Sequence, residues 1–460
     1  MIVLKYVTKI TAIAVIIILF VNFLLDFKAF SFNSMVRSRI LFAPSMENLK
    51  GVLSLSNSEY LIFGNTKSFT ETSDDWMLLK VNSNFDILRL SIFSGSFSDK
   101  IGDVVRFGDN LLAVGNTWSF RRESLDDIMV SYFDKDMNLM GFYVISGSRE
   151  DKAFKIFSVN NQPYLLSSTR SAGFGSTCIM VSKLGSDLYP TNFWVIGSVQ
   201  DQEPLDIIEL SPNKYLIVSS YLKMSGNKDC LLAVVDSNFN VTKAFAFGGA
   251  FDENLVSIVK KSKERFYFIF ETRSFKPQDK MNILISSFRK TDLSHARSFA
   301  FGTMEEERYL SHIFYQNNLY VLFYSMINKQ PTIGVIVLDS NLGYKGSYTI
   351  NSFFNLSNIV YSFYPIDQNI WVINYFNVNT LEDVGLIRTE NMVELLPPIQ
   401  SKPDFSPLKL QRYYIKVARY PNIESYPVGL QTQEVSPDSF VVSNEIQVNY
   451  FDADYSTIWR

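Results

Sequence analysis

The sequence predicts an all-β protein: a seven-bladed β-propeller of four-stranded blades, with an N-terminal transmembrane helix and a C-terminal β extension. Three observations lead to this prediction. Similar segments return about every 51 residues, each repeat holds four short apolar segments separated by turn residues, and one long apolar run lies near the N-terminus. Four short strands in a repeat of this length are typical of a propeller blade.

The composition favours a large packed core and excludes several classes of function. Of the 460 residues, 47% are hydrophobic and 15% aromatic, which is enough apolar surface to fold and excludes a disordered chain. Lys and Arg number 43 against 46 Asp and Glu, so we expect no nucleic-acid partner. With two His and two Cys, we also expect no metal and no cofactor.

The N-terminal residues, 1–30, are predicted to be a transmembrane signal-anchor. The run ITAIAVIIILFVNFLL at 10–25 approaches the roughly 20 apolar residues that span a bilayer. Lys5 and Lys9 precede it, which favours an N-terminus in the cytoplasm and a single pass, with the propeller on the extracytoplasmic side. A cleaved signal peptide and a buried core helix remain alternatives.

Three sequence anchors set the register of the repeats in the propeller region, 31–398, and one of them is an Asp before an apolar strand, as at Asp75 and Asp127. The run EYLIFGNTKSF, ending at Phe69, returns as NLLAVGNTWSF, ending at Phe120. The second anchor is an acidic residue four positions after a glycine that ends a strand-like run. We expect these side chains to form the repeat scaffold by capping backbone N–H groups where the chain enters the next blade; a ring of carboxylates around a cation is the alternative. They are Asp99, Asp151, Asp201, Asp252 and Glu306.

Each repeat reads as four strands, and the two ends of the propeller region are predicted to meet. In the second repeat the strands are GDVVRF, NLLAVGNT, DIMVSYFD and NLMGFYVISG, and their Val-, Ile-, Phe- and Tyr-rich runs suit strands buried on both faces. Residues 33–43 align with the fourth strand of a repeat, so we expect them to join the last blade. The alternative is that 392–396 supply that strand.

This pattern resembles the secreted or membrane-anchored prokaryotic β-propellers with degenerate repeats of about 51 residues. The segments that carry the resemblance are FGNTKSF, VGNTWSF, FETRSF, AFAFGGAFD and IFSGSFSD, and it covers 47–398. The resemblance implies the propeller architecture, and it implies no particular activity.

The innermost strands are expected to line a central channel. Five residues are candidates for that lining. Their mixed charges predict neither a ring of metal ligands nor a phosphate-binding ring, and they form no recognisable set of catalytic residues. They are Asp103, Lys155, Asp206, Ser257 and His312. Cys178 and Cys230 fall at equivalent places in neighbouring blades, which are too far apart for a disulfide, so we expect buried free thiols.

The last segment, 399–460, carries no repeat anchor. Seven of the fifteen Pro fall at 397–437, and LKLQRYYIKVARY and DSFVVSNEIQVNYF read as strands. We expect a C-terminal extension packed on the propeller; an eighth, divergent blade is the alternative.

These observations together predict a membrane-anchored extracytoplasmic β-propeller that acts as a binding or scaffolding module without catalysis. The expected partners are the membrane, through the N-terminal helix, and a protein or cell-envelope component, contacted through loops on one propeller face. The alternative is an enzyme, a hydrolase or a quinone-type dehydrogenase, with its site at the mouth of the channel. A purely structural envelope component is the third possibility.

Overall fold

The structure is a computed structural model, and all the regular elements among its described residues are β-strands. Among the residues that it describes there is no helix, and hence none long and apolar enough to cross a membrane. The predicted transmembrane segment, 1–30, lies outside them. The described residues are 37–41, 47–67, 73–84, 86–95, 97–119, 125–248, 251–260, 262, 264–274, 280–302, 305–327, 330–350, 359–365, 370–377, 381–388, 417–419, 424–427 and 447–451.

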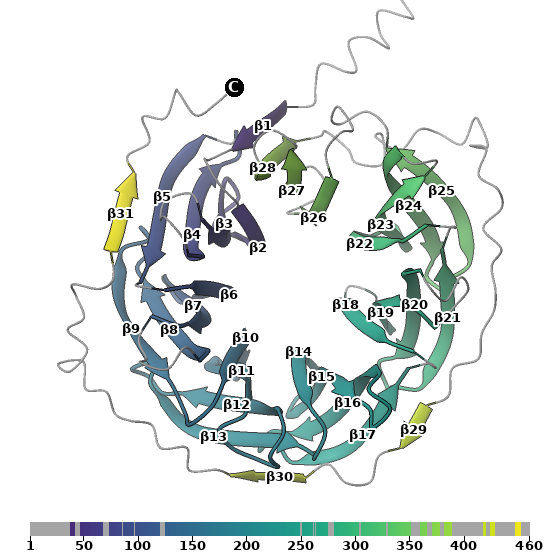
Figure 1. Ribbon diagram of the computed structural model, residues 1–460, viewed down its shortest axis with the longest axis horizontal. Helices are drawn as coiled ribbons and strands as arrows, with labels where there is room; N and C mark the ends of the chain where they lie inside the picture. The colour runs from purple at the N-terminus through teal and green to yellow at the C-terminus, as the bar shows by residue number, and fades with distance from the viewer. Residues whose placement is uncertain are drawn as a thin grey trace, which may run out of the picture.

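Six blades of four consecutive antiparallel strands stand around a ring, each with its first strand innermost (Figure 1). The first three are β2 (Glu47–Ser54), β3 (Glu59–Thr66), β4 (Asp75–Asn82) and β5 (Ile87–Ser94); β6 (Asp99–Phe107), β7 (Asn110–Thr117), β8 (Asp127–Phe133) and β9 (Leu139–Ile145); and β10 (Asp151–Val159), β11 (Gln162–Thr169), β12 (Cys178–Leu184) and β13 (Pro190–Gly197). The next three are β14 (Gln202–Ser211), β15 (Lys214–Leu222), β16 (Lys228–Asp236) and β17 (Val241–Phe247); β18 (Glu253–Val259), β19 (Arg265–Thr272), β20 (Asn282–Arg289) and β21 (His295–Phe301); and β22 (Arg308–Tyr315), β23 (Asn318–Ile327), β24 (Gln330–Asp339) and β25 (Tyr344–Ile350).

The structure corrects the predicted seven blades to six blades of four consecutive strands. The remaining sheet of the ring is composite: β26 (Ile359–Pro365), β27 (Ile370–Asn377) and β28 (Leu381–Arg388) are completed by β1 (Arg37–Leu41) from the other end of the chain. The count was wrong because repeats in the sequence and blades in space are different units here: the last repeat contributes three described strands. Arg37 lies opposite Arg388 in the β1–β28 ladder, which confirms the predicted pairing of 33–43 with the last repeat.

The described parts of the C-terminal segment add fifth strands to three blades, which corrects the expectation of four strands in every blade. β29 (Val417–Arg419) pairs with β17, β30 (Glu424–Pro427) with β13, and β31 (Gln447–Phe451) with β5, always on the outer edge (Figure 1). No described strand after residue 388 forms a blade of its own. These strands cover edges that would otherwise offer unpaired backbone groups.

The blades pack face to face, and this explains the apolar runs of their middle strands. Five successive residues of β7 and seven of β16 are buried. One core cluster joins Leu166 and Val181 of one blade to Ile217 and Leu231 of the next. Because each blade is covered on both faces, the middle of its second and third strands forms a continuous apolar run and does not alternate with exposed polar residues.

The hairpins between third and fourth strands repeat one local device. Asp236 Oδ1 accepts hydrogen bonds from the backbone N–H groups of Asn238 and Asn240, both at 2.9 Å. The turn holds Phe239 in the left-handed region, with φ at 60°, and its side chain is fully buried. The same conformation recurs at Met137, Leu188, Leu293 and Leu342. The Asp236 side chain therefore stabilises a turn that holds the Phe239 side chain in the core between two blades.

The strand directions give the ring two distinct faces. Each inner strand begins, and each second strand ends, at one end of the ring, which we call the upper face; the opposite end is the lower face. β1 begins at the lower face, because Arg37 lies opposite Arg388, where the third strand of the composite sheet ends.

Candidate functional site

The five predicted channel-lining residues lie in the innermost strands of five successive blades (Figure 1). Four of them follow directly on a β-bulge that interrupts the pairing of their strand. In the fifth blade of this series, Ser311 takes the equivalent place and His312 is the next residue. A bulge re-aims the side chains beside it, so the repeat presents one side chain per blade at the same height of the inner wall.

Two of these residues form an ion-paired group with a third that the sequence had not singled out. Lys155 is bonded to Asp206 Oδ1, and Lys260, just after β18, lies 2.6 Å from Asp206 Oδ2. Burial alone would raise the pKa of Asp206, but the two ammonium groups hold it below its usual value. Burial lowers the pKa of Lys260, whereas the Asp206 carboxylate outweighs burial and raises the pKa of Lys155. One carboxylate thus ties three neighbouring blades together.

Asp103 extends this group to a fourth blade through the backbone. Its Oδ2 accepts a hydrogen bond from Ile156 N at 3.0 Å, and its Oδ1 accepts one from Val104 N at 2.9 Å. Burial raises the pKa of Asp103, while the pKa of Asp206 is lowered. Two neighbouring carboxyl groups whose pKa values are shifted in opposite directions are typical of a catalytic acid and base. Here, however, both oxygens of each carboxyl group are already bonded to the scaffold, so the arrangement favours a role in joining blades.

Ser257 and His312 meet across the next blade joint. Ser257 Oγ lies 3.2 Å from His312 Nδ1, and the hydroxyl of Tyr309 lies 2.7 Å from the same nitrogen. One ring nitrogen can accept one proton at a time, so Tyr309 competes with Ser257 for it. A shorter serine–histidine contact, 2.8 Å between Ser298 Oγ and His295 Nε2, lies within β21. Sequence spacing gave no sign of either contact.

The predicted repeat-scaffold residues lie at the upper face, at the joints between blades. Asp99 Oδ2 accepts hydrogen bonds from Gly95 N at 2.9 Å and from Ser119 Oγ at 2.8 Å, and Asp151 accepts one from Ser171 Oγ at 2.8 Å. Burial raises the pKa of Asp99 to about 6 and raises that of Asp151 in the same direction. Among the described residues, no group of three or more His, Cys, Asp or Glu side chains could hold a metal ion.

In the later blades the equivalent of Asp99 is one residue further along. The loops that lead into β14, β18 and β22 are one residue longer, so Gln202, Glu253 and Glu307 take the buried position. Asp201 and Asp252 instead accept hydrogen bonds from backbone N–H groups at the start of the third strand of the preceding blade: Thr177 N at 2.7 Å and Lys228 N at 2.8 Å. Glu306 lies 4.0 Å from Arg273 in an ion pair.

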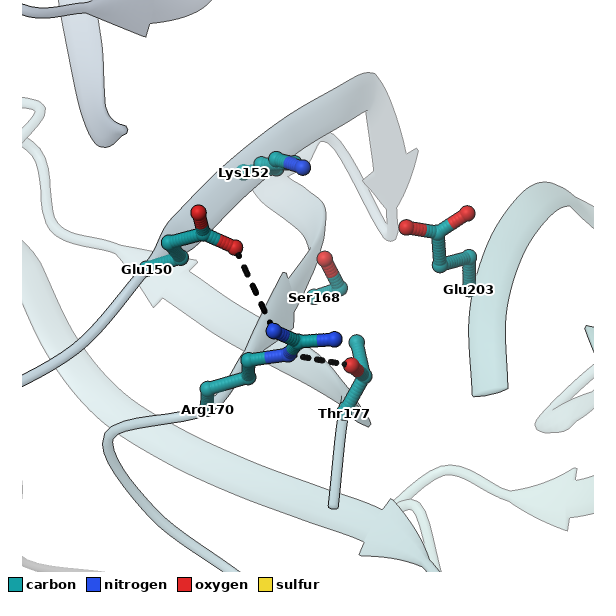
Figure 2. Close-up of a pocket in the computed structure, with 6 residues that line it drawn as sticks. All are labelled: Glu150, Lys152, Ser168, Arg170, Thr177 and Glu203. Carbon is teal, nitrogen blue, oxygen red and sulfur yellow. Dashed lines mark hydrogen bonds and ion pairs between the residues drawn. The ribbon is translucent and has the colours of Figure 1, made fainter. Parts of the chain in front are cut away.

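A shallow polar hollow opens on the upper face between the blades that begin with β10 and β14. Figure 2 shows Arg170 between Glu150 and Thr177, with Glu203 on the far side of the hollow. Arg170 Nε donates to Thr177 Oγ1 at 2.8 Å, and its other nitrogens lie 3.6 Å from Glu150 and 3.8 Å from Asp201. The hollow encloses about 210 Å³, including open solvent, which is less than the 300–1,000 Å³ typical of small-molecule sites.

Large apolar side chains are exposed on the loops of the same upper face, and the sequence did not single them out. Met224 is 90% exposed and Val199 is 71% exposed; Phe97, Trp118 and Phe251 are exposed as well. All five lie in loops that follow the second or the fourth strand of a blade, and these strands end at the upper face. Sequence periodicity marks apolar residues without telling exposed from buried ones. The one available signal was that these residues stand in turn segments, outside the strand runs.

The prediction of two buried free thiols is confirmed, since Cys178 and Cys230 are both free and buried. Burial also raises the pKa of the Cys230 thiol far above its usual value, which suppresses the reactive thiolate. We expect neither thiol to react with Ellman's reagent in the folded protein, and both to react after unfolding in guanidinium. Release of one equivalent from folded protein would contradict this burial.

No protein-family model and no curated protein matches the chain. Among solved structures, the chain is similar to the β-propeller domain of the Trilobed protease from Pyrococcus furiosus, at 10% identity and a TM-score of 0.41, over 74% of this chain and 95% of that one. It is also similar to a GH32 β-fructofuranosidase from Bombyx mori, at 11% identity and a TM-score of 0.35, over 85% and 94%. These likenesses concern the propeller fold with repeated blades, and nothing about activity follows from them.

Proposed function

We propose that this protein is a membrane-anchored, extracytoplasmic β-propeller that binds a protein or cell-envelope partner through the loops of its upper face and catalyses no reaction. The observation that carries the proposal is the gathering of exposed apolar side chains on those loops. Exposed large apolar residues that cluster on one face are typical of interaction surfaces. The proposed anchor rests on the apolar run at 10–25.

The anchoring is tested by fractionation of cells that express the full chain with a C-terminal tag. We expect the chain to sediment with membranes, to resist extraction by alkaline carbonate, and to lose its tag to protease added outside the cytoplasmic membrane. A carbonate-soluble chain in the cytosol would contradict the proposal.

A hydrolase is the second candidate, on the contact between Ser257 and His312. It requires His312 to take the proton of Ser257, for which Tyr309 must first release the same nitrogen. A fluorophosphonate probe tests this candidate on the full chain. Labelling that disappears in Ser257→Ala and persists in Ser311→Ala would favour the hydrolase, and no labelling would exclude a nucleophilic serine there.

A further inference from the structure

The strand β21 ends in a sequence that, one blade earlier, already carries an added strand. Residues 245–247 of β17 are Phe-Ala-Phe, and they pair with β29. Residues 299–301 of β21 are Phe-Ala-Phe as well. Both segments pair with the third strand of their own blade in one register, with Phe247 opposite Cys230 and Phe301 opposite the equivalent Ile283. The two strands therefore turn equivalent backbone groups outward.

Among the described residues, no strand covers the outer edge of β21. Its sheet has the order β18-β19-β20-β21, whereas the sheet of the blade before it ends in β17 and β29. The exposure of the middle residue reflects this difference, since Ala246 beside β29 is 3% exposed and Ala300 is only half-buried. An open edge offers its backbone N–H and C=O groups to another extended chain.

The added strands on three other blades show how such a chain binds. β29, β30 and β31 each run antiparallel to the outer strand and begin opposite its last residue. The shortest of them, β29, has three residues, so a short extended segment is enough. The same geometry on β21 starts opposite Phe301 and runs toward the lower face, and we count positions 1 to 5 of an added strand from there.

The aromatic side chains beside this edge favour apolar residues at positions 1 and 3. These positions lie opposite Phe301 and Phe299, and directly opposite residues of antiparallel strands share one face of the sheet. Tyr344 is 46% exposed and stacks on Phe299, with the ring centroids 6.2 Å apart. Apolar side chains at positions 1 and 3 therefore extend a surface that already holds a half-exposed aromatic ring.

Position 5 lies opposite Arg297, whose charge favours an acidic residue there. Arg297 is exposed, and its Nη1 donates a hydrogen bond to Asn341 O at 3.2 Å. No acidic residue in the described part of the chain forms an ion pair with it. A carboxylate at position 5 supplies a charge-assisted pair across the strands. The segment directly ahead of β29, 405–416, holds three basic residues and no acidic one, so charge favours a strand from another protein.

We infer that the outer edge of β21 binds an extended strand of a partner protein, with apolar residues at positions 1 and 3 and an acidic residue at position 5. This surface lies on the side of the ring. The inference goes beyond the proposed contact through the upper-face loops, and it stands or falls regardless of what those loops bind.

The test traps a synthetic peptide on the full chain by thiol exchange. The peptide acetyl-Val-Cys-Val-Thr-Glu-amide carries its thiol at position 2, opposite Ala300→Cys, and acetyl-Val-Thr-Val-Cys-Glu-amide carries it at position 4, opposite Ser298→Cys. Directly opposite residues of an antiparallel pair are close enough for a disulfide. Cys178 and Cys230 are buried, so they contribute little background.

We expect each variant to prefer the peptide in its own register by about threefold or more at equilibrium with glutathione, measured by mass spectrometry of the intact chain. Met224→Cys, at a side chain that is 90% exposed on a loop, is the control and should prefer neither peptide. Two further peptides are methylated on alternate backbone nitrogens, and only the one whose methyl groups face β21 should lose its binding. Adding Arg297→Glu to Ala300→Cys should make Lys at position 5 better than Glu by about two- to fivefold.

Three outcomes would overturn the inference. Trapping without preference for either register, or equal trapping of both methylated peptides, would show that no strand is added to β21. An unchanged preference for Glu in the variant with Arg297→Glu would overturn the acidic position. Thiols at positions 298 and 300 that resist both peptides and glutathione itself would show that the chain covers this edge with its own residues, and no separate protein would bind there. Each of these outcomes leaves the proposal for the upper-face loops standing.

Discussion

Replacing Phe239 by alanine should lower the free energy of unfolding by about 3–5 kcal/mol, the usual loss for truncating a fully buried Phe. The ring of Phe239 is fully buried, with its centroid 5.0 Å from that of Trp194 and 5.5 Å from that of Tyr164. Phe157 and Tyr215 complete the contact, so the cavity would be lined by aromatic rings held by two blades. Chemical denaturation followed by tryptophan fluorescence measures the change.

A surface phenylalanine provides the control for this prediction. Phe97 is 58% exposed on the upper face, and Phe97→Ala should change the unfolding free energy by less than about 0.5 kcal/mol. Asp236→Ala removes the hydrogen bonds that hold the turn around Phe239, and it should destabilise the protein by an intermediate amount. Similar losses of unfolding free energy for Phe239→Ala and Phe97→Ala would show that burial of the Phe239 side chain does not stabilise the fold as described.

Asp99 should make the protein less stable as the pH rises from about 4 to about 6. Burial raises the pKa of this carboxyl group from 3.8 to about 6, against the opposing hydrogen bonds of Thr117 and Ser119. The folded state therefore holds the proton more tightly than the unfolded state. The contribution is fully present below the unfolded pKa and is lost as the pH passes through the folded pKa. A shift of this size corresponds to about 3 kcal/mol.

The measurement compares the parent chain with Asp99→Asn, which keeps the shape of the side chain and cannot ionise. We expect the difference in unfolding free energy between the two to change by about 2 kcal/mol in favour of the variant between pH 4 and 6.5. Asp109→Asn, the same substitution at an exposed lower-face hairpin, is the matched control. Parallel pH curves for Asp99→Asn and the parent chain would show that Asp99 does not titrate as described.

Much of the fold followed from the sequence because its signals are local. Turn residues bound the strands, apolar runs mark strands buried on both faces, and the repeat fixes which strands are equivalent. The pairing of 33–43 with the last repeat followed from the same alignment. The number of complete blades did not follow, because the composite sheet draws its outer strand from a segment more than 300 residues away, at Arg37–Leu41. Nor did the pairing of β29, β30 and β31 with three outer edges, since strands this short carry no record of their partner.

The same division runs through the candidate site. The sequence by itself determined that Asp103, Lys155, Asp206 and Ser257 occupy equivalent places on inner strands, because equivalence is a matter of spacing. Only the tertiary structure decided that Asp206 holds two lysines from different blades, and that the Met224 side chain is left 90% exposed. The physical reason is that ion pairs and exposure depend on distances between blades, and packing of the closed ring sets those distances.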